Sequence, residues 1–249
     1  MGDGFKMRSI LLCEGKTDAD FLQYYMRKVH QWEDGRPADF KPKGFTFGRI
    51  LTRDNDELSI IALNGCGDII HGVKEALEHN ILERPDKIFK NEIFVTDNDD
   101  EATISDRISE VIDITNSMGI ATNSKIENAN WTELCYKNNM GEDLHTSILP
   151  MIIPFGNKGA IETFLLDAVA EKDEYDKCII DKGKEYVKNA DPEKRYLKQR
   201  RHITKAEYEV FFAIRTTEGQ FNDRQDILKG IPWEQYTKIQ ESFKEFEKI

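Results

Sequence analysis

Three acidic residues stand directly after short apolar runs of the sequence. Glu14 follows Arg8–Cys13 (RSILLC), and Asp97 and Asp99 follow Glu92–Thr96 (EIFVT). In extended backbone, side chains two residues apart point the same way, so the two aspartates share a face. Crowded carboxylates repel one another unless a cation neutralises them. Carboxylate oxygens suit Mg²⁺, with Mn²⁺ as a substitute, and Mg²⁺ keeps positions for phosphate oxygens, so these residues predict a metal site that acts on phosphate.

The residues around these acids predict alternating strands and helices. A helical pattern follows each of three apolar runs, of which the second is Leu58–Leu63 (LSIIAL). Successive strand–helix units build a parallel sheet, and ligands bind at the carboxyl ends of its strands. We therefore expect Glu14, the turn 64–68 and Asp97 to lie along one edge of a sheet.

Two regions are predicted along the chain. Residues 1–156 are expected to form the α/β domain, with an insertion at about 30–57 and a hairpin at about 130–155. The insertion is indicated by its Gly and Pro residues, and the hairpin by two apolar runs around a polar NNMGED turn. Helical spacing of apolar residues in 157–249 predicts a mainly helical C-terminal region that packs on the domain.

Three short motifs follow the three apolar runs in order, EGKTDADF, NGCGD and DNDDE. Together they resemble the Toprim domain of bacterial primases, topoisomerases and OLD-family nucleases, over about residues 8–115. The resemblance implies an α/β fold, a Rossmann-like three-layer sandwich with a mostly parallel central sheet. It also implies that Glu14 acts as a general acid or base and that Asp97 and Asp99 hold Mg²⁺. Ala102 stands where the family pattern has glycine, which leaves open a site that binds metal without catalysis.

Two further acids are candidate metal ligands by the same resemblance. Glu101 has the spacing found in topoisomerases. Glu162 begins a helix beyond an expected fourth strand, where OLD-like nucleases place an acid that serves a second metal. The alternative for Glu101 is a solvated or helix-capping side chain, and the alternative for Glu162 is a favourable interaction with the helix N-terminus.

Phosphate-binding candidates lie beside the acids and in the C-terminal region. Lys16 could steady a phosphate next to Glu14. Gly65 and Gly67 suit a close approach of phosphate, although a tight turn with positive φ is the simpler reading. A basic segment of an otherwise acidic chain is a candidate nucleic-acid contact, with Lys198, Arg200, Arg201 and Lys205 as its members.

Composition excludes several classes of protein. The formal net charge of the 249 residues is -11, which argues against coating nucleic acid by bulk electrostatics. No apolar run approaches the roughly 20 residues of a membrane span, and the N-terminus lacks a signal-peptide pattern, so a cytoplasmic location is expected. The 4 cysteines and 5 histidines lack zinc-like spacing, and neither disulfides nor structural zinc are predicted.

The leading hypothesis is a metal-dependent nuclease that cleaves phosphodiester bonds in DNA or RNA. It would work alone or with a separate ATPase chain, as in phage-defence systems resembling OLD proteins. The chain is short for a topoisomerase or a primase. A second hypothesis is a non-catalytic module that binds a nucleotide or nucleic acid and acts with a partner protein. A third is a DxD enzyme of another class, such as a nucleotide-sugar transferase or a haloacid-dehalogenase-like phosphatase.

Overall fold

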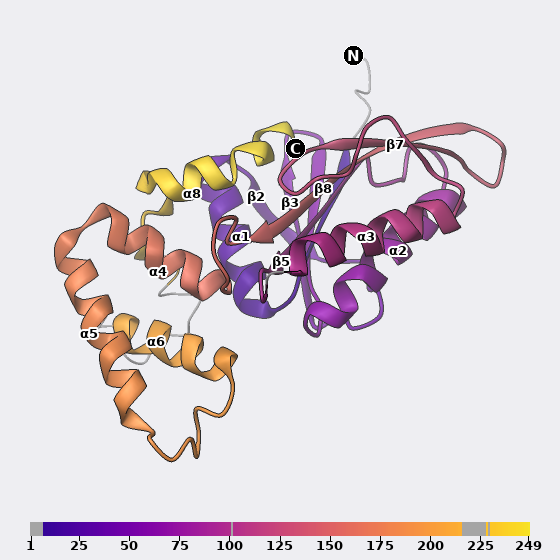
Figure 1. Ribbon diagram of the computed structural model, residues 1–249. Coiled ribbons are helices and arrows are strands. Elements are labelled where there is room, and N and C mark those ends of the chain that lie inside the picture. The colour runs from indigo at the N-terminus through magenta and orange to yellow at the C-terminus, as the bar shows by residue number, and fades with distance from the viewer. Residues whose placement is uncertain (1–6, 101, 216–227, 229) are drawn as a thin grey trace. The chain divides into compact units, whose positions relative to one another are not determined.

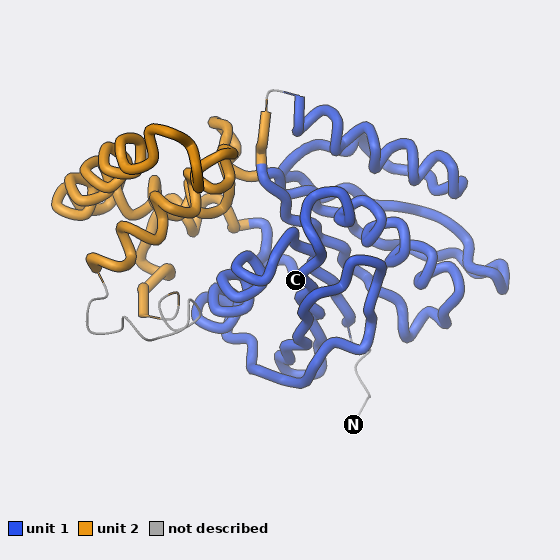
Figure 2. The backbone as a smooth tube through the Cα atoms, turned by 90° about the horizontal axis from the view of Figure 1, so that it is seen from below, with its two compact units in different colours: residues 1–97, 101–152, 245–249 blue, residues 98–100, 153–244 orange. Residues whose placement is uncertain are grey.

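The computed structural model describes residues 7–100, 102–215, 228 and 230–249. Figure 2 shows the two compact units into which the chain divides. The first unit contains residues 1–97, 101–152 and 245–249, and the second contains residues 98–100 and 153–244. The sequence predicts a division after residue 156. In the structure, residues 245–249 at the end of the chain belong to the first unit, and residues 98–100 in the middle of the DNDDE motif belong to the second.

The first unit interleaves strands with helices (Figure 1). Its strands are β1 (Arg8–Cys13), β2 (Glu33–Pro37), β3 (Phe47–Arg53), β4 (Asp56–Ala62), β5 (Asn91–Asp97), β6 (Ala121–Thr122), β7 (Thr132–Lys137) and β8 (Asp143–Ile153). Its helices are α1 (Lys16–Val29), α2 (Cys66–Leu82) and α3 (Thr103–Ser117).

The described strands form one mixed sheet in the order β2-β3-β4-β1-β5-β8-β7-β6. Strand β1 pairs in parallel with both β4 and β5. The pairs β2–β3, β3–β4, β6–β7 and β7–β8 are antiparallel. The chain is α/β, but the prediction of a Toprim-like three-layer sandwich around a mostly parallel central sheet is wrong.

The error arose in segments that were not recognised as sheet strands. Residues 30–57 were predicted to be a surface insertion, yet they contain β2 and β3. Every residue of β2 is exposed, and its sequence, EDGRP, contains the Gly and Pro that strands disfavour. It forms by pairing with β3, where Arg49 Nη2 lies 2.6 Å from Asp34 Oδ2 across the two strands. Antiparallel strands were thus added to one side of the parallel centre.

Alternation along β1 divides its side chains between the two faces of the sheet. Ile10 and Leu12 are buried in one apolar cluster with Val73 and Leu77 of α2. Leu11 lies on the opposite face and is also fully buried. The run RSILLC is therefore almost continuously apolar because both of its faces are covered.

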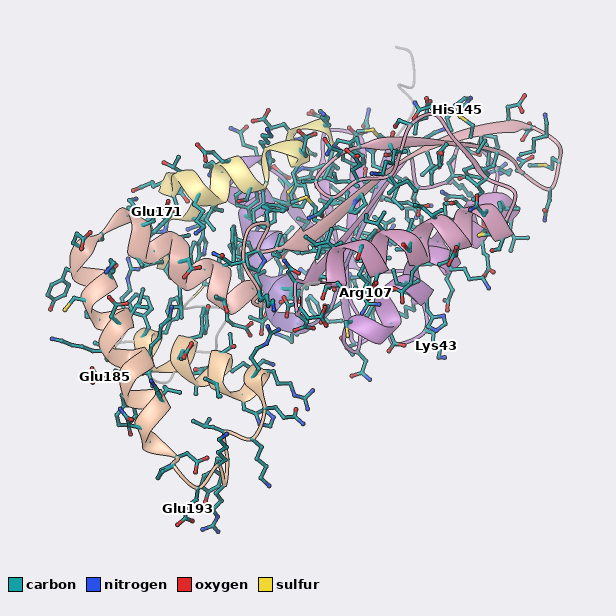
Figure 3. The ribbon with its side chains drawn as sticks, viewed as in Figure 1. Lys43, Arg107, His145, Glu171, Glu185 and Glu193 are labelled. Atoms are coloured by element: carbon teal, nitrogen blue, oxygen red, sulfur yellow. The ribbon has the colours of Figure 1, made fainter. Side chains whose placement is uncertain are left out.

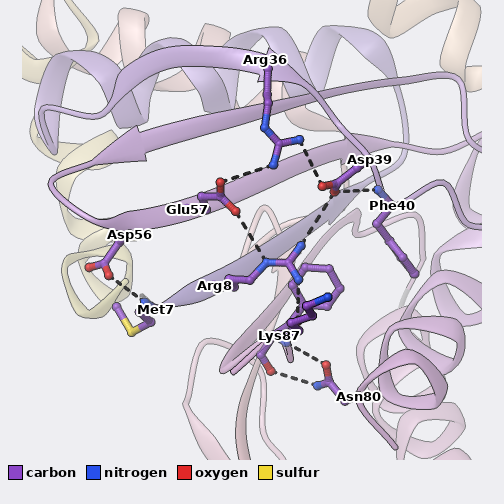
Figure 4. Close-up of polar contacts among 10 residues, drawn as sticks. Met7, Arg8, Arg36, Asp39, Phe40, Asp56, Glu57, Asn80 and Lys87 are labelled. Carbon is purple, nitrogen blue, oxygen red and sulfur yellow. Dashed lines mark hydrogen bonds and ion pairs between the residues drawn. The ribbon is translucent and has the colours of Figure 1, made fainter. Parts of the chain in front are cut away.

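A half-buried arginine, Arg8, fixes the beginning of β1 (Figure 4). Arg8 Nε lies 3.6 Å from Glu57 Oε2, and its Nη2 lies 3.8 Å from Asp39 Oδ1. Its Nη1 donates to the carbonyl of Lys87, and the guanidinium stacks 5.0 Å from the ring centroid of Phe89. These contacts tie β1 to β4 and to the segment before β5, and so help to set the register of the three parallel strands.

An amide and a buried carboxyl group join α2 to the start of β5. Asn80 Nδ2 donates to the Phe89 carbonyl and to Glu92 Oε1, both at 2.9 Å, and Asn80 Oδ1 accepts from the Phe89 N–H at 2.7 Å. Glu92 is only 2% exposed, and its Oε2 has no hydrogen-bond partner among the described residues. Burial raises the pKa of Glu92 well above its ordinary value, because the charged form would be poorly solvated.

This raised pKa predicts a stability that falls with increasing pH. The folded state retains the Glu92 proton longer than the unfolded state, so the stabilisation is complete below the ordinary carboxyl pKa and is lost as the pH rises toward the raised pKa. Glu92→Gln keeps a neutral group there and should flatten the dependence of the thermal midpoint on pH. Glu78→Gln, at an exposed position of α2, should keep the wild-type slope; equal slopes in all three proteins would contradict the prediction.

The described residues of the second unit form mainly helices. Its elements are α4 (Ile161–Lys172), α5 (Glu174–Ala190), α6 (Arg200–Arg215), the 3-10 helix η2 (Trp233–Gln235) and α8 (Thr237–Ser242). A further 3-10 helix, η3 (Lys244–Lys248), leads back into the first unit. Phe164 and Phe243 meet edge to face with ring centroids 5.8 Å apart. None of the helices in the described ranges is both long and apolar enough to cross a membrane.

Candidate functional site

The parallel strands of the first unit end along a common edge. Cys13 at the end of β1 pairs with Ala62 of β4 and with Val95 of β5. Glu14 follows Cys13 directly, Asp97 comes two residues after Val95, and Gly65 comes three residues after Ala62. The edge therefore brings together the strand ends that carry the sequence-predicted residues of this unit.

Glu14 is attached to the end of β5 through its side chain. Its Oε1 accepts a hydrogen bond from the backbone N–H of Asp97 at 2.9 Å and another from the hydroxyl of Thr96. Its own carbonyl accepts from the N–H of Gly65 at 2.9 Å. Two donors on one oxygen suit a carboxylate, which only accepts. The contacts hold Glu14 next to the backbone of Asp97, on adjacent parallel strands.

Lys16 is already paired within α1, with the residue four positions further along the helix. Its Nζ lies 2.9 Å from Asp20 Oδ2, and the Asp20 side chain is only 3% exposed. The ammonium also lies 5.5 Å from the centroid of the Phe47 ring. About half of the Lys16 side chain remains exposed, so a contact with phosphate would compete with Asp20 for the same charge.

The thiol of Cys13 beside these acids is suited to packing and not to nucleophilic attack. Burial raises its pKa well above the ordinary value, and the negative charges of Asp18 and Glu14 raise it further. A buried thiol in this environment stays protonated and unreactive.

Arg107 on α3, labelled in Figure 3, is a cation whose charge interacts with Glu14 and which was not among the sequence-predicted site residues. Its Nη1 lies 2.7 Å from Glu110 Oε2, and 19% of its side chain is exposed. Burial opposes its charge, but the hydrogen bond and charge of Glu110, with smaller contributions from Cys66 and Glu14, raise the pKa of Arg107. Its field reaches Glu14 although the two are 93 positions apart, and only the fold reveals this.

The two predicted glycines differ in conformation. Gly65 has φ +87 and is the N-cap of α2, whereas Gly67 lies in the first turn of the helix and has open space where a Cβ atom would lie. A side chain at positive φ is strained by about 1–3 kcal/mol. Gly65→Ala should therefore lower the free energy of unfolding by at least about 1 kcal/mol. Gly67→Ala should be neutral or stabilising by up to about 1 kcal/mol. Urea denaturation of both variants tests the difference, and equal midpoints would contradict it.

In the second unit, both the backbone and the side chain of Asn98 form hydrogen bonds. Its N–H donates to the carbonyl of Ile153 at 2.7 Å, and its carbonyl accepts from the N–H of Gly159 at 2.9 Å. Its side-chain Nδ2 donates to the carbonyls of Pro154 and Asn157 at 3.1 and 3.2 Å. Its Oδ1 is buried and accepts nothing from the described residues, as suits an oxygen left for water or a cation. The residue between the two predicted metal-binding aspartates is therefore rigid.

Asp99 forms an ion pair with Arg200, the first residue of α6. About half of each side chain is exposed. A predicted metal ligand and a predicted nucleic-acid contact are thus partners of one another. The other members of the basic segment, Lys198, Arg201 and Lys205, are all exposed.

Of the two remaining candidate metal ligands, Glu162 and Glu101, the structure describes only Glu162. Glu162 lies in the first turn of α4 and is only 5% exposed. Its place suits an interaction with the helix N-terminus as well as a metal. Glu101 lies outside the described residues.

The fold and these acids define an α/β protein with carboxylates at the ends of its parallel strands. The chain belongs to the family described as protein of unknown function (DUF3226), whose sequence pattern matches residues 8–246. Comparison with curated proteins found no match.

Solved structures include distant matches. A hypothetical protein from Pyrococcus horikoshii OT3 is 17% identical, with 90% of this chain and 96% of that chain covered and a TM-score of 0.49. An integron cassette protein from V. cholerae is 11% identical, with 59% and 97% covered and a TM-score of 0.18. A fosfomycin resistance protein from Listeria monocytogenes is 8% identical, with 61% and 94% covered and a TM-score of 0.18. None of these similarities assigns an activity to this chain.

Proposed function

We propose that this protein is a metal-dependent nuclease, with Glu14 and Asp97 as the centre of its site. The observation that carries the proposal is the bond from the Asp97 N–H to Glu14 Oε1, which holds the Glu14 carboxylate against the backbone of Asp97 at the ends of adjacent strands. The donor set fits Mg²⁺, because carboxylate oxygens are its usual protein ligands and it binds through only one or two of them. Asp99 enters the proposal by its position two residues after Asp97. The Toprim resemblance of the three motifs supports these roles and stays a prediction.

The residues of the chain have separate tasks in this proposal. Glu14 would act as general base and accept the proton of an attacking water that lies within hydrogen-bond reach of its carboxylate. Asp97 and Asp99 would supply ligands for the metal. When bound, Mg²⁺ supplies charge stabilisation for the attacking and leaving oxygens of the phosphodiester. Arg107 adds positive charge near Glu14, and the exposed basic segment at the start of α6 offers contacts to the phosphate backbone.

A non-catalytic binding module is the second candidate, and the Asp99–Arg200 ion pair favours it. An aspartate neutralised by arginine attracts a metal less strongly, so the basic segment would then bind a nucleotide or nucleic acid without cleavage. A separate ATPase partner and a cytoplasmic location remain proposals from the sequence alone.

Labelled DNA and RNA, incubated with the protein in Mg²⁺, in Mn²⁺ or in excess chelator, distinguish the two candidates. The nuclease proposal predicts cleavage that requires metal and stops with chelator. Tight binding in calorimetry without turnover under either metal would favour the binding module. Cleavage that persists in chelator would contradict the metal-dependent mechanism.

A further inference from the structure

A second group of metal-binding side chains lies on the antiparallel strands of the first unit. Glu133 and Cys135 are two residues apart on β7 and therefore point to the same face. Cys135 pairs with His145 of β8, and Glu133 pairs with Ser147, so His145 is a diagonal neighbour of Glu133. His145, labelled in Figure 3, is exposed, while Glu133 and Cys135 are half-buried. The pairing register thus places three different ligand types at one point of the surface.

Two of the three distances between the ligand atoms are close to the edges of a tetrahedral coordination sphere. Cys135 Sγ lies 3.5 Å from His145 Nδ1, and His145 Nδ1 lies 3.0 Å from Glu133 Oε1. One ligand atom from each residue lies within 4.8 Å of the others. Zinc bonds of about 2.1 Å to nitrogen or oxygen and about 2.3 Å to sulfur put tetrahedral ligands roughly 3.4–3.6 Å apart. Only small side-chain movements would bring the three atoms to that spacing.

We propose that Glu133, Cys135 and His145 bind a zinc-class divalent cation. The thiolate and the imidazole select zinc over Mg²⁺, which prefers oxygen ligands and retains its water. Three protein ligands leave a fourth position open to water or to a ligand. This site is separate from the carboxylate edge, because β8 lies between β7 and β5 in the sheet.

The surroundings of Glu133 support a positioned ligand. Asn123 Nδ2 donates to Glu133 Oε2 at 3.1 Å, and Asn123 Oδ1 accepts from the Glu133 N–H at 3.2 Å. Partners of this kind orient a metal-binding carboxylate and leave its other oxygen for the metal. In that arrangement Oε2 is occupied by Asn123, and Oε1 faces His145.

The site also joins two strands, so metal binding should stabilise the protein. A cation held by β7 and β8 binds the folded hairpin and not the unfolded chain, which raises the thermal midpoint in proportion to the logarithm of metal concentration.

The test uses the full chain, stripped with chelator, reduced, and titrated with Zn²⁺ and with Co²⁺. The proposal predicts stoichiometric binding at this site and a thiolate-to-cobalt charge-transfer band. Cys135→Ser should lower zinc affinity at least about tenfold and abolish the band. Cys178→Ser, at an exposed free thiol of α5, is the matched control and should leave both unchanged.

Three results would overturn the site, two of them concerning Cys135 and the third concerning Cys178. The first is zinc binding by Cys135→Ser with wild-type affinity, and the second is the absence of a thiolate band in the wild-type protein. The third is a cobalt band that disappears in Cys178→Ser, which would assign the thiolate to that residue. Circular dichroism of each variant shows that the fold is retained. Because the readouts concern sulfur ligation and not cleavage, they do not depend on the nuclease proposal.

Discussion

Glu14→Gln should lower metal-dependent cleavage by about 100-fold or more, since it removes a carboxylate that acts as general base. The amide has the same size, and its oxygen can still accept from the Asp97 N–H and the Thr96 hydroxyl, so the bonds to β5 are retained. The loss should therefore appear in turnover while the thermal midpoint changes little. Initial rates of cleavage of a labelled substrate at saturating Mg²⁺ measure it.

The control for this prediction is Asp113→Asn, which removes an exposed acid from α3. It changes the net charge of the protein by the same amount as Glu14→Gln and should keep the wild-type rate. Asp97→Asn combined with Asp99→Asn should lose activity as severely as Glu14→Gln, because the metal ligands are weakened. Full activity in that double variant would contradict the assignment of these acids.

Asn98→Asp should have the largest effect on stability among substitutions near the predicted site. The Asn98 amide donates to the carbonyls of Pro154 and Asn157, and a carboxylate would place an acceptor against both. Leaving buried polar groups unpaired costs about 1–3 kcal/mol each. The free energy of unfolding should fall by at least that amount for Asn98→Ala and by more for Asn98→Asp, because repulsion is added. Urea denaturation with two spectroscopic probes measures the change.

Asn139→Asp is the matched control for this substitution. Asn139 is exposed in the turn between β7 and β8, where surface substitutions change stability by less than about 0.5 kcal/mol. If Asn98→Asp were as stable as Asn139→Asp, the side-chain bonds of Asn98 would not be holding residues 154–157.

The strands at the centre of the sheet could be predicted from the sequence because each of them is a short, nearly continuous run of apolar residues. Arg8–Cys13 begins and ends as expected, and β5 extends the predicted run by one residue at each end. A strand covered on both faces is apolar along its whole length, so a short stretch of sequence is enough to recognise it. Strand β2 has no such signal, since it is exposed and depends on pairing with β3. The antiparallel character of the sheet was missed for that reason.

The candidate site also has features that could be predicted from the sequence and features that could not. The adjacency of Glu14 and Asp97 follows from the order of strands and turns, which the sequence contains. The Asp99–Arg200 ion pair joins residues 101 positions apart, and no periodicity predicts it. The spacing of cysteines and histidines along the chain predicts no zinc site, because Cys135 and His145 are ten positions apart. Their proximity depends on the register of a hairpin, which fixes cross-strand neighbours.

The most direct test of the central claim is a crystal structure of the protein soaked in Mn²⁺, with anomalous scattering measured at the manganese edge. We predict an anomalous peak within ligand distance of Glu14 and Asp97, which disappears in the Asp97→Asn, Asp99→Asn variant. Anomalous peaks elsewhere in the molecule with none at these two carboxylates would contradict the account.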